Sequence, residues 1–220
     1  MIIKARPLPV WLVSWGSLAI TRSFFWWRYK KLVINNDFEV KPGHSYILML
    51  NHFGFIDGFF AYWLCFYWLN KKQKVKNFYM MSVKRQMEKN WWLKFIGSFS
   101  VEPGKRSVNE TLDYAASLLD QPGNVLLYFP QGNLESLHIR HIEFKEGLYE
   151  IATRTTGDCQ LIWCSNIIEY FESVKPTAYL NMLDCGTNKD FDFDGLKERI
   201  NEHHRLSFNK TVRFTDEFSN

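Results

Sequence analysis

His52 and Asp57 stand five residues apart, directly after the apolar run Tyr-Ile-Leu-Met-Leu at 46–50. A carboxylate that accepts the proton of one imidazole nitrogen fixes the tautomer and leaves the other nitrogen free to take a proton from a hydroxyl. The pair is therefore a candidate for an oriented general base. For these two residues taken alone, the plainer interpretation is that Asp57 caps a helix and His52 is a hydrogen-bonded core histidine.

The pattern around the pair predicts where it lies. The run at 46–50 is typical of a buried strand, and the glycines that follow it mark a loop and the start of a helix over 59–69. His52 then follows the carboxyl end of a strand, where open α/β sheets bind their ligands. Asp57 falls in the cap or first turn of the helix, from which it can reach back to the imidazole.

The rest of the chain alternates between strand and helix patterns, which predicts an α/β fold with a mixed, largely parallel central sheet flanked by helices. Ser107 is predicted to cap one helix, with Glu110 completing a capping box. The adjacent His203 and His204 in the last helix are expected on a solvated face. Further strands are predicted over 77–82, 98–102, 125–129, 160–168 and 178–184, and helices over 84–94, 107–120 and 195–207.

Asn51-His52-x4-Asp57 resembles the first signature block of the glycerolipid acyltransferase family, whose best-known members acylate lysophosphatidic acid. Further segments follow in the order and approximate spacing of that family, from about residue 34 to about residue 184. Gly-Ser-Phe-Ser-Val-Glu-Pro at 97–103 is similar to the second block. Phe-Pro-Gln-Gly-Asn-Leu at 129–134 resembles the third, Phe-Pro-Glu-Gly-Thr-Arg. Phe-Lys-Glu-Gly at 144–147 is similar to the segment that opens the next helix, and 161–164 stands in place of the fourth block.

The resemblance implies acyl transfer from a thioester to a lipid hydroxyl, with His52 and Asp57 catalytic and no covalent intermediate. The donor would be acyl-CoA or an acyl carrier protein, a co-substrate rather than a cofactor. Backbone N–H groups at 131–133 would stabilise the oxyanion, because glycine lets the backbone approach a substrate. Candidate substrate-binding residues are Asn51, Gly97, Glu102, Lys105, Arg106, Phe129, Pro130, Gln131, Gly132, Asn133 and Lys145.

The departures from the family pattern concern the acceptor. The resemblance implies that two arginines and a glutamate bind its phosphate and polar head, and here these positions are Pro103, Leu134 and Gln131. Neither proline nor leucine replaces the planar fork of donors that arginine presents to phosphate. Lys145 and the pair at 105–106 are possible replacements, although a solvated loop explains the pair equally well. We therefore expect an acceptor other than lysophosphatidic acid, for instance an amino-acid-containing lipid.

The N-terminal segment, 1–31, is expected to anchor an acyltransferase domain, 32–220, to membrane lipids. Its apolar part, 10–21, is shorter than the roughly 20 residues that span a bilayer. Extending it to Trp27 includes Arg22, which would cost several kcal/mol inside the membrane. A helix lying in the interface is therefore favoured over a spanning helix, a signal peptide or a soluble helix packed on the domain. We expect the protein at the cytoplasmic face of a membrane.

Other classes of function find less support in the sequence. Four cysteines without a CxxC spacing predict neither a metal site nor disulfides. No G-x-S-x-G elbow supports a serine hydrolase, and the basic residues form no motif for nucleic acid. A non-catalytic membrane or lipid-binding homologue remains the alternative to an enzyme. The intact pair of His52 and Asp57 favours the enzyme.

Overall fold

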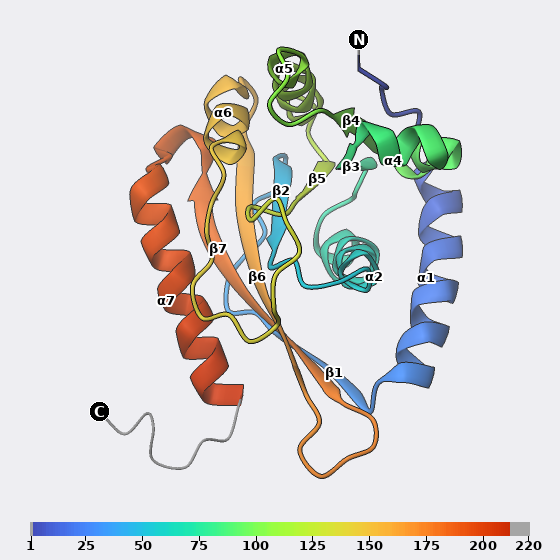
Figure 1. Cartoon of the computed structure of the whole chain (residues 1–220), viewed down its shortest axis with the longest axis vertical. Coiled ribbons are helices and arrows are strands. Elements are labelled where there is room, and N and C mark those ends of the chain that lie inside the picture. The colour runs from blue at the N-terminus through green and yellow to red at the C-terminus, as the bar shows by residue number, and fades with distance from the viewer. Residues whose placement is uncertain (1, 212–220) are drawn as a thin grey trace.

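The computed structural model describes residues 2–211 and contains one seven-stranded sheet in the order β1-β7-β6-β2-β5-β3-β4 (Figure 1). Every neighbouring pair of strands is parallel except β6 and β7, which are antiparallel. The predicted mixed, largely parallel sheet is therefore confirmed. The strands are β1 Lys31–Asn35, β2 Ser45–Leu50, β3 Asn77–Val83, β4 Ser98–Val101, β5 Asn124–Tyr128, β6 Cys159–Glu169 and β7 Thr177–Thr187.

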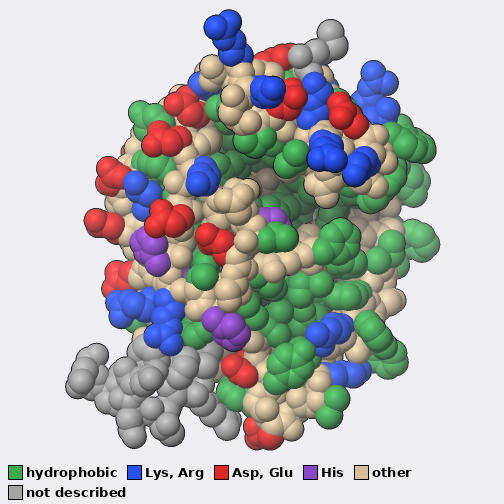
Figure 2. Space-filling view, viewed as in Figure 1, with side chains coloured by type: hydrophobic (Ala, Val, Ile, Leu, Met, Phe, Trp, Pro, Cys, Tyr) green, Lys and Arg blue, Asp and Glu red, His purple; other side chains and the backbone are tan. Residues whose placement is uncertain are grey.

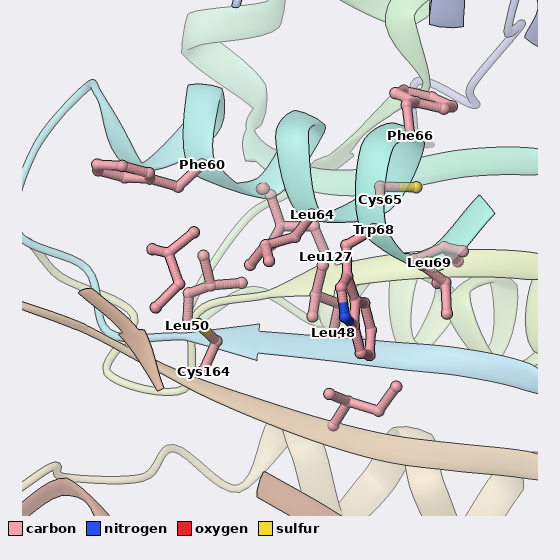
Figure 3. Packing of buried hydrophobic residues seen from close by; sticks show 14 of the residues in the cluster. Leu48, Leu50, Phe60, Leu64, Cys65, Phe66, Trp68, Leu69, Leu127 and Cys164 are labelled. Carbon is pink, nitrogen blue, oxygen red and sulfur yellow. The ribbon is translucent and has the colours of Figure 1, made fainter. Parts of the chain in front are cut away.

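Helices cover both faces of this sheet, which explains why its central strands are largely apolar. All six residues of β2 are buried. Along β2, Leu48 and Leu50 pack under α1 and α2, while Ile47 and Met49 pack under α5, α6 and α7. Figure 3 shows the first of these layers, in which Leu48 and Leu50 lie beneath the helical segment that carries Phe60 and Leu64. The long helices are α1 Val10–Arg28, α5 Ser107–Leu119, α6 Gly147–Arg154 and α7 Phe193–Thr211, and the short α2 is Asp57–Trp63.

Several predicted elements differ from those in the structure. The helix predicted over 84–94 is divided at Asn90 into α4 Lys84–Lys89 and the 3₁₀-helix Trp91–Ile96, because Asn90 is not helical. The helix after the first strand begins at Asp57 and continues after α2 as a π-helix, Leu64–Leu69, and a final turn, α3 Asn70–Lys72. The strand β1 was not predicted, since it is a short edge strand whose pattern merges with the basic segment before it.

Two predictions about polar residues are wrong. Ser107 does not cap α5: it is the first helical residue, and its hydroxyl donates to the Glu102 carboxylate at 3.2 Å. The last helix does not present both histidines to solvent, because His204 is fully buried and His203 is partly buried. Both rings lie on the side of α7 that faces β6 and β7, where each one finds a hydrogen-bond partner.

The N-terminal helix α1 is present, and its last turn packs on α2. The ring of Phe25 stacks on Phe60 with their centroids 5.2 Å apart, and Phe24 stacks on Phe59 at 4.4 Å. The segment before α1 is bound to the edge of the sheet, where Ile3 and Ser100 exchange two hydrogen bonds. Within residues 2–211, no helix has both the length and the apolar character that crossing a bilayer requires.

Candidate active site

His52 and Asp57 are in contact at the carboxyl end of β2, as the sequence predicted. Nδ1 of His52 lies 2.8 Å from Oδ2 of Asp57, the first residue of α2. The same oxygen accepts from the backbone N–H groups of Phe53 at 2.7 Å and Gly54 at 3.0 Å. Asp57 is only 1% exposed, so three donors surround one carboxylate oxygen in a buried position. This loop fixes both the carboxylate and the imidazole that it contacts.

The other nitrogen of His52 is left available. The imidazole stacks on the ring of Phe129, with centroids 4.1 Å apart and planes 19° apart. Its side chain is 27% exposed, and Nε2 has no hydrogen-bond partner among the residues that the structure describes. If Nδ1 carries the proton that Asp57 accepts, Nε2 is a base open to a hydroxyl group. The geometry is therefore suited to general-base chemistry.

Gln131 holds the third-block loop against the backbone of His52. Its Oε1 accepts from the His52 N–H at 2.6 Å, while its Nε2 donates to the carboxylate of Glu135. Glu135 completes the arrangement by donating its own N–H to the carbonyl of His52 at 2.9 Å. Because Gln131 is buried and both ends of its amide are engaged, it positions His52 rather than offering its side chain to a substrate. A glutamate here would place a second carboxylate beside Glu135.

Residues that follow Gln131 form an exposed turn beside the site. Gly132 has a φ of +68°, which favours glycine, and a Cβ there would lie 3.3 Å from Cγ of Lys145. The backbone N–H of Lys145 donates to the carbonyl of Pro130 at 2.9 Å. Asn133 is exposed in the same turn. The structure thus brings Pro130, Gly132, Asn133 and Lys145 together, and Lys145 is the cation that lies next to this turn.

The helix α7 packs against the loop that follows Gln131, through residues that no motif in the sequence indicates. Asn201 accepts from the N–H of Ile142 at 2.6 Å and donates to its carbonyl at 3.2 Å. Nε2 of His204 lies 3.0 Å from the carbonyl of Ile139, so this nitrogen carries the proton, and Nδ1 accepts from the hydroxyl of Ser165 at 3.0 Å. Burial lowers the pKa of His204 and favours this neutral form. No local sequence pattern signals these contacts.

Asn51, the residue before His52, ties β2 to β6. Its amide nitrogen donates to the carbonyl of Asn166 at 3.1 Å, and its oxygen accepts from the N–H of Asn166 at 2.7 Å. The side chain is 1% exposed. Asn51 was predicted to bind substrate, but its buried amide instead fixes the strand end from which His52 extends.

The second-block residues lie at opposite ends of β4. Gly97 precedes β4, at the amino end of the parallel strands, whereas His52 lies at their carboxyl end; the φ of Gly97 is +94°. A Cβ at this position would lie 1.9 Å from the carbonyl oxygen of Phe78, which requires glycine for structural reasons. Gly97 therefore has a structural role at the amino end of the parallel strands, the end opposite His52.

Glu102 follows β4, at the carboxyl end of the parallel strands, where His52 also lies. Its carboxylate pairs with Lys84 at 3.0 Å, and this contact, aided by the Ser107 hydroxyl, holds the pKa of Glu102 below its usual range. Lys105 and Arg106 are exposed in the loop that follows. Because β4 is three strands from β2, about 14 Å separates these strand ends. The two cations are near the site but not in contact with His52.

The surface around these strand ends is largely apolar. Figure 2 shows hydrophobic side chains across the face formed by α1 and α2, and a hollow where α4 overhangs α2. Leu134 is 61% exposed, and Phe55, which follows His52 in the loop, is also exposed. Within residues 2–211 there is no cluster of side chains that could hold a metal ion. The site therefore combines an oriented imidazole with an apolar surface.

Comparisons with known proteins concern the family and the fold of the chain. Residues 31–165 match the model of a family described as Acyltransferase. The fold is similar to the crystal structure of the 1-acyl-sn-glycerophosphate (LPA) acyltransferase PlsC from Thermotoga maritima, with a TM-score of 0.60 and 14% sequence identity. That match covers 91% of this chain and 81% of the other. No curated protein sequence matches the chain.

Proposed function

The chain belongs to the acyltransferase family, and on that premise we propose that it moves a fatty acyl group from an acyl thioester to a hydroxyl group of a lipid. The contact between His52 and Asp57 carries this proposal, since the carboxylate orients the imidazole and Nε2 has no partner among residues 2–211. The donor is acyl-CoA or an acyl carrier protein. Both present the same thioester to this site.

The reaction is a direct displacement at the thioester carbonyl. Nε2 of His52 takes the proton of the acceptor hydroxyl while the hydroxyl oxygen forms a bond to the carbonyl carbon of the thioester. The tetrahedral intermediate then breaks its C–S bond, and the imidazolium returns the proton to the leaving thiolate. Asp57 stabilises the imidazolium in between, and no bond between enzyme and acyl group is required. The products are an acylated lipid and a free thiol.

The oxyanion of the intermediate requires hydrogen-bond donors near His52. In the turn at 131–133, the N–H of Gly132 is already bonded to the carbonyl of Phe129 at 3.1 Å. The N–H of Asn133 has no such partner in the described part of the chain. We therefore assign the oxyanion contact to Asn133. The positive φ of Gly132 gives the turn its shape.

We propose that the acceptor lacks a phosphate monoester. The positions where the resemblance implies phosphate-binding arginines are Pro103 and Leu134, both exposed and neither a hydrogen-bond donor in its side chain. The carboxylate of Glu135 follows Leu134 in the chain and disfavours a dianion there. In the Pro103 loop, the carboxylate of Glu102 is paired with Lys84, and Lys105 and Arg106 are exposed without contacting His52. Lys145 beside Gly132 provides one positive charge. These features favour a neutral or zwitterionic headgroup, such as that of an amino-acid-containing lipid.

We also propose that the protein works at the cytoplasmic surface of a membrane, where its lipid acceptor is found. Large aromatic side chains on α1 are exposed, among them Trp11, Trp15, Trp26 and Trp27. Exposed indoles are stable at the level of lipid headgroups, and a helix of this kind can lie in the interface. Basic residues near the end of α1 match an anionic surface.

A His52→Ala variant tests the enzymatic proposal against a non-catalytic, lipid-binding role, which the altered second and third blocks would also fit. With purified protein, an acyl thioester and a panel of lyso-lipids, we expect product formation to fall by roughly a hundredfold to ten-thousandfold. His44→Ala is the matched control, because His44 is partly exposed and precedes β2, at the opposite end of that strand from His52. If His52→Ala keeps full activity at normal abundance, the enzymatic proposal fails.

A further inference from the structure

A second cluster of charged and aromatic side chains lies outside the candidate active site, in an open pocket of about 460 Å³. The end of α1, the start of β1, the end of α2 and the loop before β7 form its walls. Four of its lining residues are cations, namely Arg22, Lys30, Lys31 and Lys175. No acidic residue lines it. Segments far apart in the sequence therefore converge to make one basic pocket.

The walls of this basic pocket are held together by specific contacts. The guanidinium of Arg28 donates to the hydroxyl of Tyr170 at 2.9 Å, and the N–H of Lys30 donates to the carbonyl of Pro176 at 2.8 Å. The ammonium of Lys175 donates to the carbonyl of Trp26 at 3.3 Å. These three contacts fasten the loop between β6 and β7 to the end of α1. The basic pocket is thus built into the fold.

Its cations are available to an anion. In the part of the chain that the structure describes, none of Arg22, Lys30 and Lys31 forms a salt bridge. Among these described residues, the ammonium of Lys175 forms no salt bridge either; it donates to the carbonyl of Trp26 and lies 5.8 Å from the centre of the Trp26 ring. Like charges that converge without a counter-charge repel one another, and an anion among them relieves that repulsion. The charge of the basic pocket is therefore complementary to a phosphate group.

The surrounding rings indicate that this phosphate belongs to a membrane lipid. Trp26 is 81% exposed and its neighbour Trp27 is 67% exposed. Indole rings are enriched where lipid headgroups meet the acyl chains, so the basic pocket opens beside side chains suited to that depth. A soluble anion would need no such apolar rim. Trp63 also lines the basic pocket and adds a second indole.

We propose that the basic pocket binds the phosphate of an anionic membrane phospholipid, which is held there and not converted. The basic pocket and His52 both lie toward the carboxyl ends of β2 and β6. Leu50, at the end of β2, pairs with Cys164 of β6, and β6 continues from there to Glu169, which pairs with the start of β7. Phe25, a lining residue, stacks on Phe60 of α2, the helix that begins at Asp57. A lipid bound here would orient the active-site hollow toward the bilayer. The inference rests on the proposed membrane surface but not on the proposed chemistry.

The test is co-sedimentation of purified protein with vesicles of phosphatidylcholine alone or mixed with phosphatidylglycerol. We expect tighter binding to the anionic vesicles and, for the triple variant Lys30→Gln/Lys31→Gln/Lys175→Gln, a loss of roughly tenfold or more in that affinity. The matched control is Lys71→Gln/Lys72→Gln/Lys74→Gln, which removes the same charge before β3 at the opposite edge. Equal losses in both triple variants would mean unspecific attraction and would overturn the proposal.

Two further arms separate the alternatives. Inorganic phosphate is compared with sodium chloride at equal ionic strength. Phosphate binding that the glutamine variant loses, together with equal binding of the wild type to both kinds of vesicle, would show a free-anion site and overturn the lipid assignment. Lys30→Arg/Lys31→Arg/Lys175→Arg keeps the charge, and we expect it to bind anionic vesicles like the wild type. Acyl transfer to detergent-dispersed lipid should be unchanged in the glutamine variant. Failure of acyl transfer in the wild type, with selective binding intact, would count against the proposed function alone.

Discussion

The loop that carries His52 and the loops that carry Pro103 and Leu134 lie at the same edge of the sheet, yet they are built differently. Around Asp57, three donors converge on one buried carboxylate oxygen, and Gln131 holds the backbone of His52 from the other side. Pro103 and Leu134 are exposed. The first region is fixed by local hydrogen bonds, so substitutions there disturb the base. The second can change its recognition chemistry at little cost to the fold.

Gln131 stands at the boundary between the two regions. Its carbonyl oxygen accepts from His52, as a glutamate would, but its amide also donates to Glu135. A glutamate at this position would face the carboxylate of Glu135 and leave the negative charges unpaired. The glutamine therefore keeps the support for the base while the residues after it, Asn133 and Leu134, differ from the family pattern.

Of the substitutions that test this comparison, Asp57→Asn should cause the largest loss of activity. An asparagine cannot accept as a carboxylate does from the imidazole and from the N–H groups of Phe53 and Gly54, so His52 loses its orientation and its charge partner. We expect kcat to fall by roughly a hundredfold or more, with a loss of stability of about 1–3 kcal/mol. Steady-state kinetics and thermal unfolding measure the two effects.

Asp158→Asn provides a comparison for that change. Asp158 is exposed before β6, and within residues 2–211 its carboxylate has no hydrogen-bond partner, while its backbone oxygen accepts from Ser45. It should leave kcat and stability unchanged. If Asp57→Asn costs less than about threefold in kcat, the carboxylate does not support a general base of the kind proposed.

A smaller effect, a gain of activity toward lysophosphatidic acid, is expected when arginines are placed in the loops that carry Pro103 and Leu134. In Pro103→Arg/Leu134→Arg, both side chains start from exposed positions, so the fold should tolerate them. A guanidinium offers bidentate donors to phosphate, and we expect kcat/KM for lysophosphatidic acid to rise by roughly tenfold, the effect of about 1.4 kcal/mol. The control, Pro103→Gln/Leu134→Gln, has donors but no charge. A gain in the control equal to that of the arginines would show that charge is not what these loops lack.

The smallest effect is a pH dependence of stability that comes from His204, the residue of α7 that bonds to the carbonyl of Ile139. Burial keeps the folded-state pKa of His204 below its ordinary value of 6.5, so the unfolded chain binds the proton more readily than the folded one. The contribution of His204 to the free energy of unfolding is therefore fully present above about pH 6.5, and it declines as the pH falls from that value through the lower folded-state pKa. Urea unfolding at several pH values should show a weaker acid dependence in His204→Gln. An unchanged pH slope would mean that His204 does not contribute.

Local patterns were sufficient for much of the fold. The buried run of β2, the alternation of strands and helices, and the reach of Asp57 to His52 all follow from residues close together in the sequence. The break at Asn90 was missed because the basic, Trp-containing stretch around it has the composition of a single helix.

What the sequence could not predict depends on contacts between distant segments. Burial of His204 requires Ser165 and Ile139, which are 39 and 65 residues away. Gly97 matched a family block, but its role is to pass close to Phe78, and the parallel strands place it away from the site. The same reason explains Asn51 and Gln131, whose residue types suggested ligand binding and whose amides are buried in backbone contacts.

The most direct test of the central claim is a competition between two acceptors. Purified protein receives one acyl thioester together with equal amounts of lysophosphatidic acid and a monoacylated amino-acid lipid, and mass spectrometry measures the two acylated products. The intact base and the missing arginines predict that the amino-acid lipid product predominates, by roughly tenfold for a single lost charge-assisted contact, and that His52→Ala suppresses both products. A predominance of acylated lysophosphatidic acid would contradict the claim that recognition has changed while the base remains.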